Sequence, residues 1–237
     1  MGGHRITSMS KGATMNEQEY RERICDIQNR INRLNNAVGA MGTYNIRKYP
    51  DTFQEISIDA AIQAEYLACK LRNIIRSYGT VQMEEHMQHV IDAQGIQIME
   101  ANGKTEITIP RLLPKWKKSR SGNFINEPLY FALHEYCKTH QVKQYRECAV
   151  CYIHEYDEKL SINRIRDYDN LQLKQIQDII ATFFLMDDGG LLCDTFHTSY
   201  LGIRDCTRIC IMAQEDLPEF IARLKSDDKF ISNLDET

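Results

Sequence analysis

The sequence predicts an α+β protein in which a helical N-terminal hairpin precedes a mixed α/β domain with a central sheet and flanking helices. Apolar residues recur every three or four positions from Tyr20 to Met41 and again from Ile58 to Tyr78, as they do on helices. After residue 94, short alternating runs that favour strands are separated by helix-like stretches. At 237 residues the chain is long enough for one large domain or two small ones.

The first predicted helix carries an apolar seam whose steps alternate between four and three residues, the spacing of a and d positions in three heptads. Gly42 ends this seam, and Gly79 ends the second helix. We expect the two helices to pack as an antiparallel hairpin within one chain; alternatively, each seam helix pairs with its copy in a dimer. The seam consists of Tyr20, Ile24, Ile27, Ile31, Leu34, Val38 and Met41.

The second part of the chain alternates between predicted helices and strands. Asn102-Gly103 between two alternating runs is a strong β-hairpin signal. Asp169 and Asn170 are good N-cap residues for the helix that follows them. Helices are predicted at 84–92, 124–140, 171–185 and 216–224, and the later strands at 148–156, 191–196 and 208–213, with a loop over 197–205.

The predicted organisation is a disordered leader (1–14), the helical hairpin (15–93), the α/β domain (94–225) and an acidic tail (226–237). No apolar run reaches the roughly 18 residues of a membrane span. The leader is small and polar and does not have the apolar core of a secretory signal. The sequence therefore predicts a cytoplasmic protein.

Eight cysteines are expected to stay reduced in the cytoplasm. Two spacings, Cys148-x-x-Cys151 and Cys206-x-x-x-Cys210, raise the alternative of a zinc site. The first pair lies in a strand-like segment, where positions i and i+3 face opposite sides of a sheet, and Cys210 lies in a similar apolar strand-like segment. Buried thiols are therefore the preferred interpretation.

Four carboxylates lie in two close pairs, Asp167 with Asp169 and Asp187 with Asp188. In an extended segment the first two side chains would point to one side. Close carboxylates repel unless a cation neutralises them, and Mg²⁺ is the hard, oxygen-seeking cation that does so in phosphodiester cleavage. The alternative is two solvated acidic turns beside a core helix.

Positive charge gathers ahead of these carboxylates. From 111 to 174 the chain has twelve Lys and Arg against eight Asp and Glu, whereas the net charge of the whole chain is −4. Such a segment fits a polyanion, although asymmetry of this size also arises by chance. Trp116 could stack on a base, and the predicted phosphate contacts are Arg111, Lys115, Lys117, Lys118, Arg120, Arg164 and Arg166.

Lys174 lies on the polar side of the predicted helix after the Asp-x-Asp pair. One interpretation is that it reaches a metal-bound phosphate. The other is an ordinary pair with Asp178, four residues on, which contributes only a few tenths of a kcal/mol.

The polar motifs resemble, in order and element type over about residues 105–213, those of the RusA family of phage-type Holliday junction resolvases. That family has a basic loop with Pro and Lys, then an Asp-x-Asp-Asn motif opening a helix with Lys and Asp, and then Asp-Asp before a strand. The matching residues are Pro114, Lys115, Asp167, Asp169, Asn170, Lys174, Asp178, Asp187 and Asp188.

The resemblance implies a homodimeric DNA endonuclease of a phage or other mobile element that nicks branched DNA with Mg²⁺, or Mn²⁺ in its place, in recombination and repair. Asp167, Asp169 and Asp188 would bind the metal, Asp187 would be an alternate ligand, and Lys174 would stabilise the transition state. The alternative is a non-catalytic DNA-binding or protein-interaction module whose N-terminal helices bind a partner.

Overall fold

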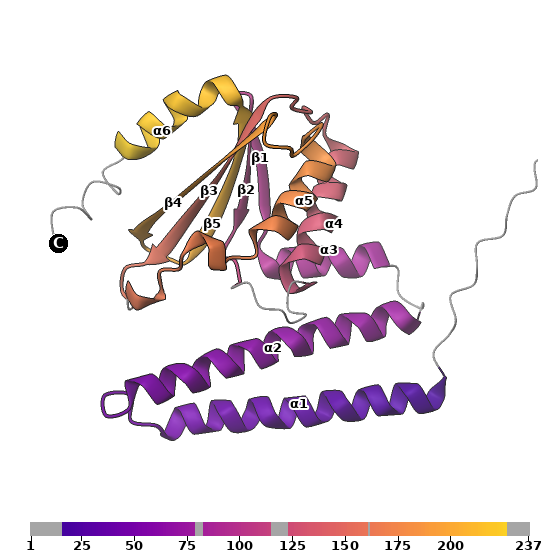
Figure 1. Cartoon of the computed structure of the whole chain (residues 1–237). Coiled ribbons are helices and arrows are strands. Elements are labelled where there is room, and N and C mark those ends of the chain that lie inside the picture. Colours follow the sequence, from indigo (N-terminus) through magenta and orange to yellow (C-terminus); the bar gives the residue numbers. More distant parts are fainter. Residues whose placement is uncertain (1–15, 79–82, 115–122, 161, 227–237) are drawn as a thin grey trace, which may run out of the picture. The chain divides into compact units, whose positions relative to one another are not determined.

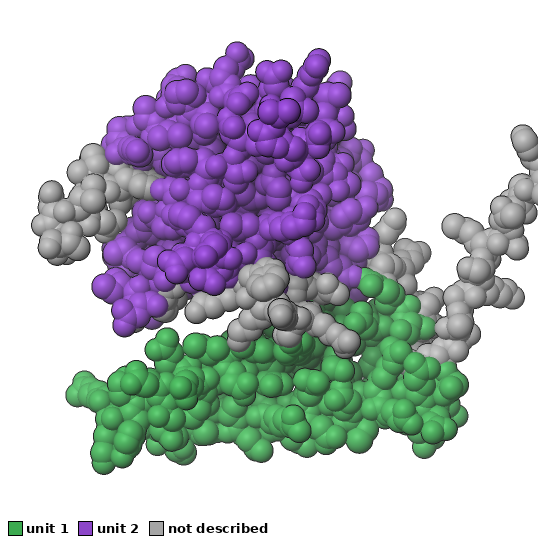
Figure 2. Space-filling model, in the orientation of Figure 1, with its two compact units in different colours: residues 1–83 green, residues 84–237 purple. Residues whose placement is uncertain are grey.

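The computed structural model describes residues 16–78, 83–114, 123–160 and 162–226 (Figure 1). The chain forms two compact units, residues 1–83 and 84–237 (Figure 2). The first contains two long helices and the second an α/β sheet domain, so the predicted α+β class with its N-terminal hairpin is confirmed. None of the described helices combines the length and the apolar character needed to span a membrane.

Helix α1 (Glu17–Thr43) begins at a conventional cap. The Asn16 side chain accepts a hydrogen bond from the backbone N–H of Glu19 at 2.8 Å, which satisfies one of the free donors of the first turn. Glu17 and Glu19 also place negative charge at the positive end of the helix dipole.

Helix α2 (Pro50–Tyr78) begins eight residues before the predicted start at Ile58. Proline suits the first turn of a helix because the N–H that it lacks would have no intrahelical partner there. Three contacts align α1 and α2 as an antiparallel hairpin. Lys70 Nζ lies 2.6 Å from Asp26 Oδ2, and Arg30 and Arg23 donate to Gln63 and Ser77 at 3.5 Å.

The second unit is built on a five-stranded sheet of order β1-β2-β5-β3-β4. The predicted Asn102-Gly103 turn joins β1 (Gln97–Ala101) and β2 (Lys104–Ile109), with φ of 53° and 73°. β3 (Cys148–Asp157) and β4 (Cys193–Gly202) run parallel, and β5 (Cys206–Ala213) pairs antiparallel with β2 and β3.

Strand β4 is longer than predicted. The expected loop over 197–205 is wrong for its first six residues, because β4 pairs with β3 along its whole length to the match of Asp157 with Gly202. Helix α5 (Leu173–Phe184) makes the crossover between these two parallel strands.

Helices cover the two faces of the sheet unequally (Figure 1). α3 (Met83–Gln94), α4 (Asn123–Thr139) and α5 contribute to the larger core, with Leu129, Leu133, Ile176 and Ile180 fully buried. The opposite face packs against α6 (Leu217–Ser226) through a smaller cluster.

Candidate functional site

The two predicted Asp-x-Asp carboxylates are exposed and do not share an extended segment. Asp167 has extended dihedral angles, whereas Asp169 lies in the 3-10 turn Tyr168–Asn170. The predicted N-cap is also wrong, because Leu171 is extended and the backbone N–H of Gln172 donates to Pro114 O at 3.0 Å. That bond holds the chain extended, so α5 begins only at Leu173.

The second carboxylate pair lies beyond the other end of α5. Asp187 Oδ1 accepts a hydrogen bond from the N–H of Gly189 at 3.2 Å and stabilises a turn. Twelve residues of helix, about 18 Å long, separate the two pairs. Within the described ranges, no three His, Cys, Asp or Glu residues gather as metal ligands. The described residues therefore show no ligand group for Mg²⁺ or Mn²⁺, and binding of either ion stays a prediction.

Lys174 and Asp178 form the predicted i,i+4 pair, with Nζ and Oδ1 3.8 Å apart. The Lys174 side chain is 87% exposed, so solvent screens the pair and its contribution to stability is small. Among the described residues, Lys174 forms no ion pair with either of the two carboxylate pairs.

Two of the predicted DNA-binding arginines stabilise the fold. Arg111 donates to Gln94 O at 3.4 Å and lies over the Phe124 ring, 5.3 Å from its centroid. Arg166 Nη1 donates to Leu113 O at 2.5 Å. Arg164 ends the 3-10 turn Ile162–Arg164. The remaining five predicted contacts lie outside the described residues: Lys115, Trp116, Lys117, Lys118 and Arg120.

A stack of four rings, which the sequence did not predict, lies beside the Asp-x-Asp motif. Tyr168 from the 3-10 turn packs over His197 of β4 at 5.1 Å and over His154 of β3 at 5.8 Å between centroids. Tyr152 stacks on the same His197 at 5.0 Å. The Tyr168 hydroxyl lies 3.1 Å from Ser199 Oγ. The stack therefore fixes the motif against the two parallel strands.

Both histidines of this stack are held neutral by burial. His154 is fully buried, and desolvation, followed by the nearby charges of His197 and Arg166, lowers its pKa to about 4. Burial also lowers the pKa of His197. His154 Nδ1 lies 3.4 Å from Thr207 Oγ1, whereas His154 Nε2 and His197 Nδ1 have no hydrogen-bond partner among the described residues.

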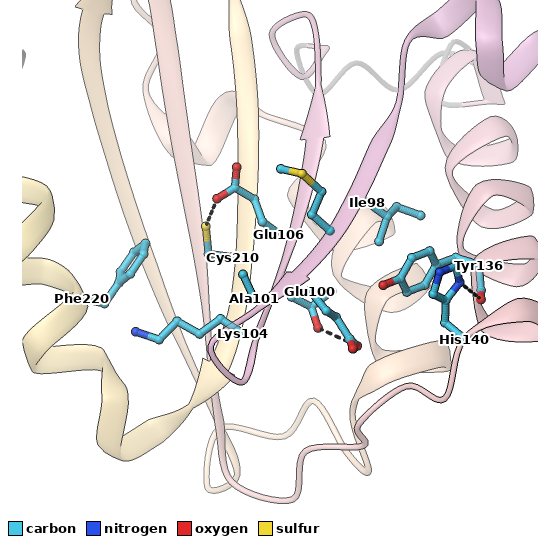
Figure 3. A pocket seen from close by; sticks show the side chains of 11 residues that line it. Ile98, Glu100, Ala101, Lys104, Glu106, Tyr136, His140, Cys210 and Phe220 are labelled. Carbon is cyan, nitrogen blue, oxygen red and sulfur yellow. Dashed lines mark hydrogen bonds between the residues drawn. The ribbon is translucent and has the colours of Figure 1, made fainter.

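A hollow of about 600 Å³ lies at the β1–β2 hairpin (Figure 3). Lys104 and Phe220 line one side of the hairpin, with Lys104 Nζ 5.3 Å from the ring centroid. Tyr136 and His140 lie on the other side, stacked at 4.1 Å. The hollow thus wraps around the open edge of the sheet, and its polar groups do not converge on one point as they would in a ligand site.

One flank of the apolar seam of α1 is exposed. Ile24, Ile31 and Val38 are seven residues apart and therefore fall within about 40° on the helix. Ile31 and Val38 are 46% and 54% exposed, whereas Ile27, which belongs to the other half of the predicted seam, is 4% exposed. Ile31 and Val38 lie about 40° and 20° from Ile27 around the helix, so they form an exposed flank of the same apolar face.

Two solved structures are similar to part of the chain. The periplasmic domain of Helicobacter pylori MotB is 8% identical, with a TM-score of 0.31, covering 56% of this chain and 90% of that one. The cell wall anchor of the T6SS from Pseudomonas aeruginosa is 12% identical, with a TM-score of 0.32, covering 56% and 98%. No curated protein matches the chain.

The comparisons contradict several predictions made from the sequence. Neither title names a nuclease or a DNA-binding protein, and the two titles name a periplasmic domain and a cell wall anchor. The predicted endonuclease, its branched-DNA partner, its roles in recombination and repair and its cytoplasmic location are therefore wrong, whereas the homodimer stays a prediction. With TM-scores this low, neither structure transfers a ligand, a location or a function to this chain.

The RusA resemblance is also wrong. It depended on motifs that cover under half of the chain and that the fold does not bring together. A family model matches residues 16–235, which include both the hairpin and the sheet domain. The chain belongs to this family, described as a family of unknown function (DUF6100).

Proposed function

We propose that the chain is a non-catalytic protein-interaction module in which the exposed flank of the α1 seam binds an amphipathic helix of a partner protein. The exposed row of Ile31 and Val38 is the observation that carries this proposal. Of the 27 residues of α1, all of which the structure describes, only Ile27 is buried. Helices in proteins depend mainly on packing of an apolar face, so an apolar face of α1 that is buried only in part calls for a second neighbour.

Two glycines support the same face. Gly39 and Gly42 lie within the helical range of α1, where glycine is about 1 kcal/mol less favourable than alanine. A Cβ at either position would meet nothing within 4 Å, so no contact within the chain requires glycine there. Gly42 falls about 20° from Ile31 on the helix. Small residues on this side would let the backbone of another helix approach closely.

The charges beside this face indicate the partner's chemistry. Gln28, Asn32 and Asn35 are exposed and uncharged, so the middle of the row suits an apolar face. Beyond Val38, the loop between α1 and α2 exposes Arg47 and Lys48, and its aromatic and aliphatic side chains are also exposed. Between Asp26 and Asp51 the chain has no Asp or Glu. The partner helix should therefore carry acidic residues at the end that reaches this loop.

A photo-crosslinking experiment tests the proposal in cells of the source organism. p-Benzoyl-phenylalanine replaces Ile31 in the full chain, and mass spectrometry identifies the crosslinked peptide. We expect one partner protein, joined through an amphipathic helix with acidic residues at one end. The same reagent at Arg33, about 160° around α1 and in no ion pair among the described residues, should give little crosslinking.

A further variant distinguishes specific binding from chance proximity. Val38→Glu places a charge on the row two turns from Ile31 and should reduce crosslinking from position 31 at least tenfold, while the helix content by circular dichroism stays unchanged because Val38 is 54% exposed. Crosslinks from position 31 to a second copy of the chain, or to residues 84–226 of the same chain, would exclude a partner helix. Equal crosslinking from positions 31 and 33 would exclude the face.

Gly39→Ala separates the stability of α1 from its binding. The substitution should raise the free energy of unfolding by about 0.5–1 kcal/mol, because alanine fits the open space and favours a helix. Urea unfolding followed by circular dichroism measures this gain. The same variant should crosslink less from position 31, since its methyl group stands on the approach side. A more stable variant with unchanged crosslinking would show that the glycine does not serve close helix approach.

A further inference from the structure

Cys148 and Cys193 are directly opposite each other on the parallel strands β3 and β4. Directly opposed side chains in neighbouring strands point to the same face of a sheet, and both cysteines belong to the core cluster that contains residues of α5. Neighbouring strands lie about 4.7–4.9 Å apart. That separation falls within the Cα–Cα range of about 4.4–6.8 Å that a disulfide spans.

The two thiols lie on the same face of the sheet. Cys193 Sγ donates to its neighbour Asp194 O at 3.8 Å. Gln177 of α5 donates from Nε2 to Cys193 Sγ at 3.4 Å, and its Oε1 accepts from the Tyr152 hydroxyl at 2.6 Å. Because the amide is held at both ends, it fixes the sulfur of Cys193 on the core face of the sheet.

The two sulfurs differ in access and in proton affinity. Cys193 is 7% exposed and follows a turn in which its N–H donates to Gly189 O at 3.0 Å, whereas Cys148 has no exposed surface. The neighbouring Cys148 thiol and the hydrogen bond from Gln177 lower the pKa of the Cys193 thiol, and the pKa of Cys148 is raised. Cys193 is therefore the first of the two to react with a reagent from solution.

We infer that Cys148 and Cys193 form a disulfide by exchange with a small-molecule disulfide such as oxidised glutathione. The Cys193 thiolate attacks one sulfur of oxidised glutathione, which forms a mixed disulfide and releases one glutathione thiolate. The Cys148 thiolate then attacks Cys193 Sγ and releases the second glutathione. Two protein thiols are oxidised, one glutathione disulfide is reduced, and the edge strand β4 becomes covalently joined to β3.

A second opposed pair on the other face is an internal control. Cys151 and Cys210 face each other across β3 and β5, and they are 0% and 3% exposed. Cys210 Sγ donates to Glu106 Oε2 at 3.6 Å, away from the other thiol. Burial raises the pKa of Cys151 to about 12 and also raises that of Cys210. This pair should stay reduced while the first pair is oxidised.

Peptide mapping of the full chain tests the inference. The folded protein is incubated with oxidised glutathione or with dithiothreitol, its remaining thiols are alkylated, and it is digested with trypsin. Cleavage leaves Cys148 and Cys151 in residues 147–159, Cys193 in 175–204 and Cys210 in 209–223. We expect 147–159 joined to 175–204 only after oxidation, with Cys151 alkylated once the protein is unfolded.

Two further measurements complete the test. The oxidised protein should melt about 5–10 °C above the reduced protein, because the bond closes a long loop. Cys148→Ser should stop at a stable glutathione adduct on Cys193 and show no such rise. A bond from 147–159 to 209–223 alone, a lasting glutathione adduct on wild-type Cys193, or no oxidation at all would overturn the inference, and none of these outcomes depends on the variant folding.

Discussion

Gly202→Ala is expected to lower the melting temperature of the sheet domain by about 10 °C, the largest effect of any single methyl group considered. A Cβ at this position would overlap Glu155 Oε1 and lie 2.7 Å from both Cδ and Cγ of that side chain. Glu155 is only 8% exposed, and its carboxylate accepts from the Tyr200 hydroxyl at 2.9 Å and from the Ile203 N–H at 3.1 Å.

The cost arises because the carboxylate cannot move away without losing these donors. Displacing Glu155 would leave a buried hydroxyl and a part-buried N–H without an acceptor, beside a partly desolvated charge. We expect a loss of about 3 kcal/mol in the free energy of unfolding, which corresponds to about 10 °C in a domain of this size. Thermal unfolding followed by circular dichroism measures this loss.

Gly190→Ala is the matched control, because a Cβ there would meet nothing within 4 Å. It should leave the melting temperature within about 2 °C of wild type. A double-mutant cycle then identifies the cause: in a Glu155→Ala background, Gly202→Ala should cost little, since the overlapping atoms are gone. An equal cost in both backgrounds would mean that the backbone, rather than Glu155, requires the glycine.

The elements of this fold could be predicted from local patterns because each pattern has a local cause. The apolar spacing of 20–41 and the Asn102-Gly103 turn act within a few residues, and both appear as predicted. Boundaries that depend on partners could not be predicted in the same way. Strand β4 continues to Gly202 because β3 is beside it, and nothing in the sequence of 197–202 alone requires a strand.

The predicted active site failed for a reason that concerns distance rather than residue type. A metal site would use the carboxylates of the two pairs, Asp167 with Asp169 and Asp187 with Asp188. One straight helix, α5, separates these pairs. Two of the arginines that were expected to bind DNA, Arg111 and Arg166, donate to backbone carbonyls of the fold instead. Spacing along the chain does not determine whether residues on either side of a helix lie close together in the fold.

The ring stack was missed because its members come from separate segments. His154 and Tyr152 are two residues apart on β3 and therefore point to the same face, and this segment was predicted to be a strand. His197, however, was assigned to a loop. A pair of histidines at strand spacing on two neighbouring parallel strands would have indicated the stack, provided that the register was known. Register is fixed by tertiary pairing, so this signal was hidden in the sequence.

Acid is expected to destabilise the sheet domain through His154, with most of the loss between pH 6.5 and about 4. In the native state the pKa of His154 is lowered from 6.5 to about 4 by desolvation, whereas in the unfolded chain it returns to the ordinary value. Between these values the unfolded state binds a proton that the native state does not, so the free energy of unfolding falls as the pH falls. Below about 4 both states are protonated and this contribution levels off.

The size of the loss follows from the shift: 1.36 kcal/mol per pH unit gives about 3 kcal/mol for His154 alone. His197 adds in the same direction, because its pKa is also lowered. Urea unfolding at pH 7, 5.5 and 4 measures the loss, and His154→Phe should remove most of it while keeping a ring against Tyr168. The exposed His89→Gln should leave the slope unchanged. If His154→Phe retains the full acid sensitivity, carboxylates rather than the buried imidazole cause it, and the stack is not the element of the fold that responds to acid.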